Sequence, residues 1–184
     1  TLNTGVYLQE TIANYRQGSI MATGLSTDVA LIDGALPVDE ASGNAGTILF
    51  RLENPDGGEA YTRNGNFTLD GNGNLVNAQG LFVLDSNGER IQLLNDAIQI
   101  AENGQIYDEN GNVVAQLGVS FVANPDLLMK QGNGLFNTMD GVNLPSAYET
   151  EGVAFTLQQS YLEGSNVDSA RSMTDLLTAY RAFE

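Results

Sequence analysis

The stretch YTRNGNFTLDGNGNLV at residues 61–76 alternates short apolar runs with Gly, Asn and Asp. The same alternation continues as far as Val122, with turn residues at intervals of about 8–12 residues. Apolar runs of this length suit strands and are too short for helices. The sequence therefore predicts a mainly β fold, an antiparallel domain rich in β-hairpins.

Asn-Gly pairs in this region predict tight hairpin turns. Type I′ turns need a positive φ at both central residues, and Asn and Gly adopt this conformation at the lowest cost. Such turns would fix the register of the strands that they join. We expect them at four positions: Asn64-Gly65, Asn72-Gly73, Asn87-Gly88 and Asn110-Gly111.

The segments on either side of this region are predicted to add a strand and loops. Thr47 to Leu52 is a strand candidate between stretches rich in Pro and Gly. Asn124 followed by Pro125 suits the start of a helix, so residues 127–129 are predicted to form one helical turn. The Gly-, Asn- and Pro-rich residues 132–151 are expected to be irregular.

The hydrophobic period changes near the end of the chain. Residues 153–159 alternate like a strand, but beyond Asn166, a good helix N-cap, apolar residues recur every three or four positions. This predicts a C-terminal amphipathic helix that packs either on its own domain or on another subunit. Its apolar stripe consists of Ala170, Met173, Leu177 and Tyr180.

The predicted elements divide the chain into two parts. Residues 1–165 form a β-rich globular domain, with the central hairpins at 47–122 as a possible sub-unit, and residues 166–184 begin the helix. The chain starts without Met and its helical pattern still runs at residue 184, so we expect a fragment of a longer protein. The first ten residues lack the basic start and apolar core of a Sec signal.

The composition excludes several functional classes. The chain has neither Cys nor His, which removes thiolate and imidazole catalysis and the usual zinc sites. With 7 Lys and Arg against 23 Asp and Glu, its net charge of -16 opposes binding to nucleic acid or anionic lipid, both of which need a cationic face. We therefore predict no catalytic residues, no cofactor and no small-molecule substrate.

Three acidic loops begin like calcium-binding loops, at Asp70, Asp85 and Asp108. An EF-hand needs Gly at its sixth position, where these loops have Leu75, Arg90 and Val113. Structural turns are thus the preferred interpretation. A secreted acidic β-module that binds calcium or carbohydrate remains the alternative function.

Four blocks of the sequence, in the right order, resemble the flagellar basal-body rod and hook protein family. Gln17-Gly18 and Asp28 to Gly34 match near the start, and residues 61–76 resemble the signature hairpin of the family. Residues 121–126 and 161–167 resemble two later motifs. The residues that carry the resemblance are Tyr61, Thr62, Arg63, Gly65, Phe67, Leu69, Asp70, Gly73, Leu75, Val76, Asn124, Pro125, Glu163, Ser165, Asn166 and Val167.

The resemblance implies a structural subunit of the flagellar rod, exported without a Sec signal and polymerising helically with itself and with other rod and hook proteins. The stripe of Ala170, Met173, Leu177 and Tyr180 would then be a subunit interface, and the isolated fragment a monomer. Residues 48–122 have room for one modest β unit, which favours a rod subunit over a hook subunit. Residues 35–47 depart from the family pattern, and we expect them to form a divergent or disordered loop.

Overall fold

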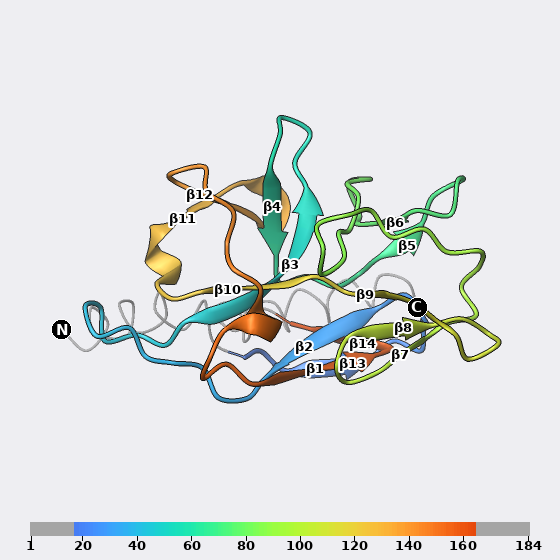
Figure 1. Cartoon of the computed structure of the whole chain (residues 1–184), viewed down its shortest axis with the longest axis horizontal. Coiled ribbons are helices and arrows are strands. Elements are labelled where there is room, and N and C mark those ends of the chain that lie inside the picture. Colours follow the sequence, from blue (N-terminus) through green and yellow to red (C-terminus); the bar gives the residue numbers. More distant parts are fainter. Residues whose placement is uncertain (1–16, 165–184) are drawn as a thin grey trace, which may run out of the picture.

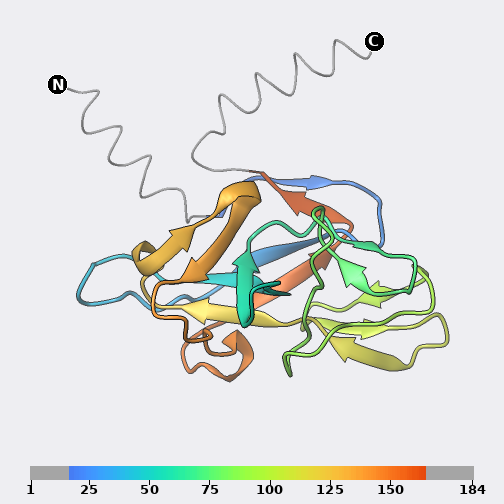
Figure 2. The same ribbon diagram turned by 90° about the horizontal axis from the view of Figure 1, so that it is seen from above.

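The computed structural model describes residues 17–164, which fold into antiparallel β-structure with no α-helix in this range (Figures 1 and 2). The mainly β, antiparallel prediction is confirmed. The strands are β1 (Ile20–Ala22), β2 (Val29–Asp33), β3 (Thr47–Glu53), β4 (Glu59–Thr62), β5 (Thr68–Leu69), β6 (Leu75–Val76), β7 (Gln99–Ile100), β8 (Gln105–Tyr107), β9 (Val113–Gln116), β10 (Val119–Val122), β11 (Leu128–Lys130), β12 (Leu135–Thr138), β13 (Phe155–Gln159) and β14 (Tyr161–Glu163).

The largest sheet has five strands in the order β10-β3-β4-β12-β11. A three-stranded sheet, β7-β8-β9, lies at the opposite end of the long axis from β11 and β12 (Figure 1). The pairs β1-β14 and β2-β13 join strands from the two ends of the described chain. The hairpin β5-β6 completes the arrangement.

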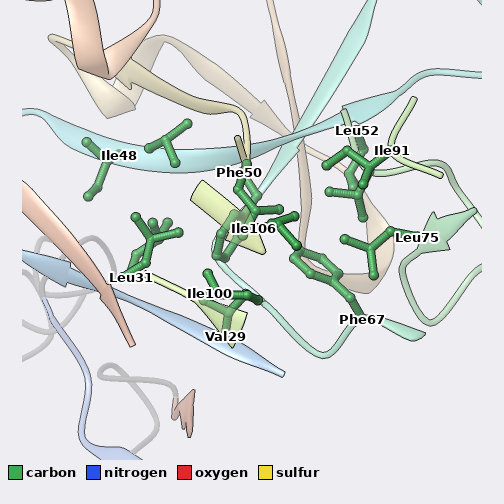
Figure 3. Close-up of a cluster of buried hydrophobic side chains, with 14 of the residues drawn as sticks. Val29, Leu31, Ile48, Phe50, Leu52, Phe67, Leu75, Ile91, Ile100 and Ile106 are labelled. Atoms are coloured by element: carbon green, nitrogen blue, oxygen red, sulfur yellow. The ribbon is translucent and has the colours of Figure 1, made fainter. Parts of the chain in front are cut away.

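The core forms around strand β3, which is buried on both faces. Ile48, Phe50 and Leu52 point into the main cluster with β2 and the central hairpins (Figure 3). Leu49 points the other way, into a second cluster with Tyr61. Full burial of one such side chain contributes about 1.5–3 kcal/mol. The predicted strand from Thr47 is therefore present and central to the fold.

Five hairpin turns share one geometry, and it differs from the type I′ turn predicted from the Asn-Gly pairs. In the turn from Asp70, the Asp70 N–H donates to the Asn74 carbonyl and the Gly73 N–H to the Asp70 carbonyl. Only the Gly has a positive φ (82°). This is a type I turn closed by a left-handed Gly, with a three-residue loop. The same pattern occurs at 70–74, 77–81, 85–89, 101–105 and 108–112.

The type I′ prediction is therefore wrong at all four positions. Asn72, Asn87 and Asn110 occupy positions of the turn that do not need a positive φ. Gly65 does not have a positive φ either; its Cα lies so close to β2 that an added Cβ would be 1.7 Å from the Val29 carbonyl oxygen.

Three further segments differ from the prediction. The helical turn after Asn124 is a 3₁₀ helix at Pro125–Leu127, two residues earlier than predicted, and the next residues form β11. Residues 132–151 include strand β12 and two more 3₁₀ turns, Gly132–Gly134 and Ala147–Glu149. Pairing with β4 and β11 outweighs the weak local β-propensity of this Gly-rich stretch.

The loop at residues 35–47 is ordered. Val38 and Ala45 form an antiparallel bridge, and the Asp39 N–H donates to the Asn44 carbonyl at 2.8 Å. Of the two alternatives expected for this loop, divergent or disordered, these bonds contradict the second, and the first stays a prediction.

The predicted C-terminal helix and its stripe lie outside the described residues. Within the described part of the chain, no helix is long and apolar enough to cross a membrane.

Candidate functional site

Arg63 follows strand β4 and lies at the centre of a polar cluster. Its Nε is 2.7 Å from Glu163 Oε1, and its Nη2 is 3.1 Å from Glu163 Oε2, so the guanidinium holds this carboxylate with two bonds. The Nη1 group donates to the Ile48 carbonyl of β3 and Nη2 to the Leu31 carbonyl of β2, each at 3.1 Å. One side chain thus joins β2, β3 and β14.

Two further side chains, Asp33 and Gln17, complete the arrangement, which we call the neck cluster: Gln17, Asp33, Arg63 and Glu163. Asp33 Oδ1 lies 2.8 Å from Arg63 Nη2. This contact is an ion pair without a well-directed hydrogen bond, because Nη2 has only two hydrogens and already faces three other acceptors.

Gln17 connects the start of the described chain to both carboxylate-bearing strands. Its Oε1 accepts from the Asp33 N–H at 2.7 Å and from Arg63 Nη2 at 3.2 Å. Its Nε2 donates to the Leu31 carbonyl and to Glu163 Oε2. The Gly18 N–H also donates to Glu163 Oε2, at 2.9 Å. Among the buried side-chain nitrogen and oxygen atoms of the cluster, only Asp33 Oδ1 lacks a hydrogen-bond partner.

The neck cluster is mostly out of contact with water. The side chains of Arg63, Asp33 and Glu163 are 19%, 16% and 6% exposed. Burial raises the pKa of Glu163, while the charge and hydrogen bonds of Arg63 oppose this shift. Breaking such a buried pair by removing one partner is strongly destabilising, because the other charge is left buried.

The two ends of the described chain meet beside this cluster. Strands β1 and β14 pair antiparallel, and the Gly164 N–H donates to the Ser19 carbonyl at 2.8 Å. A Cβ added to Gly18 would lie 1.9 Å from the Gly164 carbonyl oxygen. Only glycine fits at position 18, so the sequence itself permits this close approach of the two backbones.

The signature hairpin contributes to the core as well as to the cluster. Tyr61 is fully buried; its hydroxyl donates to Glu59 and accepts from the Leu144 N–H, and burial raises its pKa. Thr62 Oγ1 accepts from the Asn64 N–H at 3.1 Å.

Phe67 packs edge-to-face on Phe50, with ring centroids 5.0 Å apart. Leu75 and Val76 are buried, and Leu69 packs against the main cluster. The aromatic and aliphatic residues of the signature therefore lie in the core of the domain.

The other signature residues have local roles where the structure describes them. Gly65 and Gly73 lie against the backbone of Val29 and Leu93. Asn124 caps the first 3₁₀ helix, which Pro125 begins. The remaining predicted site residues lie outside the described part of the chain: Ser165, Asn166, Val167, Ala170, Met173, Leu177 and Tyr180.

The cluster brings together residues from separate signature blocks, which the sequence could not place side by side. Arg63 and Glu163 are among the residues that carry the family resemblance, whereas Gln17 and Asp33 lie in matched blocks without belonging to that set. The available signal was compositional: Arg63 is one of only seven cations in a chain with 23 acids.

The acidic turns do not form a metal site within residues 17–164, where no three acidic side chains gather suitably for a metal ion. The Oδ1 atom of Asp108 accepts from the backbone N–H groups of Asn110 and Asn112, both at 2.9 Å. Asp70 and Asp85 make the same bonds in their own turns. Hydrogen bonds from the turn, that of Asn74 foremost, hold the pKa of Asp70 below its usual value.

Two family models match the chain. The model of the flagellar hook protein FlgE/F/G D1 domain matches residues 45–115, which include strands β3 to β8. The model of the flagellar basal body rod FlgEFG protein C-terminal region matches residues 158–184 and so includes Glu163 of the neck cluster.

Curated relatives are similar over most of the chain. The flagellar hook-basal body complex protein FlhO of Bacillus subtilis is 33% identical over 184 residues, which are 100% of this chain and 67% of the relative. The flagellar basal-body rod protein FlgG of Agrobacterium fabrum is 33% identical over 178 residues, 92% of this chain and 62% of the relative. FlgG of Bacillus subtilis is 37% identical over 143 residues, 73% of this chain and 54% of the relative.

The matches cover the signature hairpin, the central strands and the strand that supplies Glu163, so they agree with the four blocks recognised in the sequence. The chain spans between about half and two thirds of the length of these relatives. This chain belongs to the family of flagellar hook and basal-body rod proteins.

Proposed function

We propose that this protein is a non-enzymatic structural subunit of the flagellar basal-body rod, which polymerises helically and transmits torque. The observation that carries the proposal is the similarity to basal-body rod proteins over nearly the whole chain. In the proposed subunit, the β-rich domain of residues 17–164 forms the outer part of the axial wall. Identical, non-closing contacts between subunits generate a filament.

The neck cluster supports this role through its position. It joins Gln17 to Glu163 where the two ends of the described chain run side by side. Segments that continue from these ends would leave the domain as an adjacent pair, in a direction fixed by buried ion pairs. A subunit that polymerises through its terminal segments needs these segments to leave the domain in a defined direction.

Residues 166–184 are the proposed assembly helix. Its apolar stripe, Ala170, Met173, Leu177 and Tyr180, would pack against neighbouring subunits, because one face of an amphipathic helix must be buried. The proposed partners are further copies of the chain and other rod and hook proteins. We also propose that the protein is exported through the flagellar secretion apparatus, without a Sec signal.

A deletion strain tests the function directly. We expect loss of the gene to abolish hooks and swimming, and the complete gene to restore both, as judged by electron microscopy of basal bodies and by motility in soft agar. Unchanged flagella in the deletion strain would contradict the proposal.

A substitution in the stripe tests the assembly helix. Leu177→Asp in the complete gene product should block assembly, because it places a charge in an apolar contact, and should leave the β-domain folded. Glu184→Gln, a conservative change outside the stripe, is the control. Normal rods and motility with Leu177→Asp would show that the helix assignment is wrong.

A further inference from the structure

The tripeptide Gly-Asn-Gly occurs in two hairpin turns of the domain, and the two turns differ. It occupies residues 71–73 between β5 and β6, and residues 132–134 between β11 and β12. When Gly follows Asn, the backbone nitrogen of the Gly can attack the Asn side chain with little hindrance, because Gly has no Cβ. The fold therefore places one reactive sequence in two environments.

The turn between β5 and β6 restrains its Asn-Gly peptide bond. The Gly73 N–H donates to the Asp70 carbonyl at 3.0 Å. The Asp70 carboxylate accepts from the N–H groups of Asn72 and Asn74, at 2.9 and 2.8 Å. The Gly73 nitrogen cannot turn toward the Asn72 side chain without breaking these bonds, each of which contributes about 0.5–1.5 kcal/mol.

The turn between β11 and β12 lacks these restraints. Gln131 occupies the position that corresponds to Asp70, and its side chain makes no capping hydrogen bond. Asn133 and Gly134 are both exposed, and a Cβ added to Gly134 would meet no atom within 4 Å. Asn133 also has a positive φ of 65°, which is uncommon for a residue other than Gly. Within residues 17–164, the Gly134 N–H meets no acceptor in good hydrogen-bond geometry.

The other Asn-Gly pairs are restrained as well. After Asn87, Asn103 and Asn110, the Gly N–H donates to a backbone carbonyl at 2.9 or 3.0 Å. Asn64 precedes the buried Gly65, whose carbonyl accepts from two backbone N–H groups. Of the six Asn-Gly pairs in the sequence, only the pair in the β11-β12 turn is both exposed and without such bonds.

We propose that Asn133 is a site of spontaneous deamidation in the folded protein. The Gly134 backbone nitrogen attacks Cγ of the Asn133 side chain. One C–N bond forms, the bond from Cγ to the side-chain nitrogen breaks, and this nitrogen leaves as ammonia with the proton of the Gly134 N–H. Water then opens the resulting succinimide ring at either carbonyl group, which gives aspartate or isoaspartate.

The modification changes the charge and the backbone of this turn. Each event adds one negative charge, and isoaspartate also lengthens the backbone by one methylene group. The change lies next to the pair of Lys130 with Phe136, which is the pair of β11 and β12 nearest the turn. Isoaspartate at position 133 should therefore increase hydrogen exchange in these two strands.

Ageing of the purified 184-residue chain at mildly alkaline pH tests the proposal. Peptide mass spectrometry follows the conversion, and an isoaspartyl methyltransferase labels the isoaspartate. In buffer, Asn133 should be converted several-fold faster than Asn72. In urea that unfolds the domain, the two rates should become similar, because both residues stand in the same tripeptide. Equal rates in buffer, or a difference that persists in urea, would overturn the proposal that the fold selects Asn133.

Exchange of the residue before the tripeptide provides the second measurement. Gln131→Asp gives the β11-β12 turn the Asp-Gly-Asn-Gly sequence of residues 70–73. The new carboxylate can accept from the turn N–H groups, so conversion of Asn133 should slow several-fold. The reverse change, Asp70→Gln, should accelerate conversion of Asn72. Circular dichroism checks that both variants fold, and an unchanged rate for Asn133 in folded Gln131→Asp would contradict protection by the turn bonds.

Discussion

The neck cluster and the hairpin turns use the same chemical group, a carboxylate, over very different distances along the chain. Glu163 binds Arg63, which is 100 positions away. In the turn from Asp108, the carboxylate accepts from the backbone N–H groups two and four positions later. The cluster therefore determines how distant strands meet, whereas each turn determines only its own loop. Substitutions should separate these roles.

The largest expected effect comes from Arg63→Met. Removal of the guanidinium leaves Asp33 and Glu163 buried without a counter-charge, which should lower the free energy of unfolding by about 3–5 kcal/mol. Urea denaturation followed by circular dichroism measures this. Arg90→Met is the matched control: its partner Glu53 is 37% exposed, and a surface pair is worth about 0–1 kcal/mol. Equal losses in the two variants would remove the distinction between buried and surface pairs.

Gly18→Ala should have the next largest effect. The added Cβ would collide with the Gly164 carbonyl oxygen, so β1 and β14 must separate, at a cost of about 1–3 kcal/mol. The same urea titration tests this, with hydrogen exchange of the β1 and β14 amides as a local readout. Gly71→Ala, in an open turn with nothing within 4 Å, is the control and should change stability little. Unchanged protection of β1 and β14 would contradict the close approach.

Asp108→Ala should cost only about 1 kcal/mol, because it removes a side-chain acceptor from two turn N–H groups that water can reach. The loss should be confined to increased hydrogen exchange in the β8-β9 hairpin. Glu109→Ala, at the same tip but without these bonds, is the control. A loss as large as that of Arg63→Met would show that the turn supports more than its own hairpin.

The smallest effect should be a change in pH dependence. Because the pKa of Glu163 is raised in the folded state, the folded protein binds more protons than the unfolded chain between the two pKa values, so this residue adds stability as the pH falls through that window. We expect the wild type to gain stability relative to Glu163→Gln between neutral pH and the ordinary Glu range. Parallel stability curves for the two proteins would contradict this.

Features of the structure that depend on neighbouring residues could be predicted from the sequence. Alternating apolar residues and Gly positions gave the antiparallel class, the strand from Thr47 and the strand within residues 153–159, because these features depend on neighbouring residues. The turn type was missed although its signal was present. An Asp two positions before Asn-Gly accepts from the turn N–H groups and so favours the type I turn with a left-handed Gly.

Contacts between residues far apart in the sequence could not be predicted in this way. Gln17, Asp33, Arg63 and Glu163 stand in separate blocks, and no local pattern shows that strands from both ends of the chain bring them together. Strand β12 was missed for a related reason: its Gly-rich surroundings favour a loop, and only pairing with β4 and β11 makes it a strand. The predicted assembly helix lies outside the described residues and stays a prediction.

The antiparallel pairing of β1 with β14 also determines how the domain would respond to mechanical force. Tension applied at Gly18 and Gly164 acts on the same end of this strand pair, so it would peel the hydrogen bonds apart one after another and not shear them all at once. Peeling is the weaker geometry. Glu163 accepts bonds from Gln17, Gly18 and Arg63 at the end of the strand pair where peeling would begin. These bonds would therefore have to break first, and they would raise the force needed to start the separation of β1 from β14.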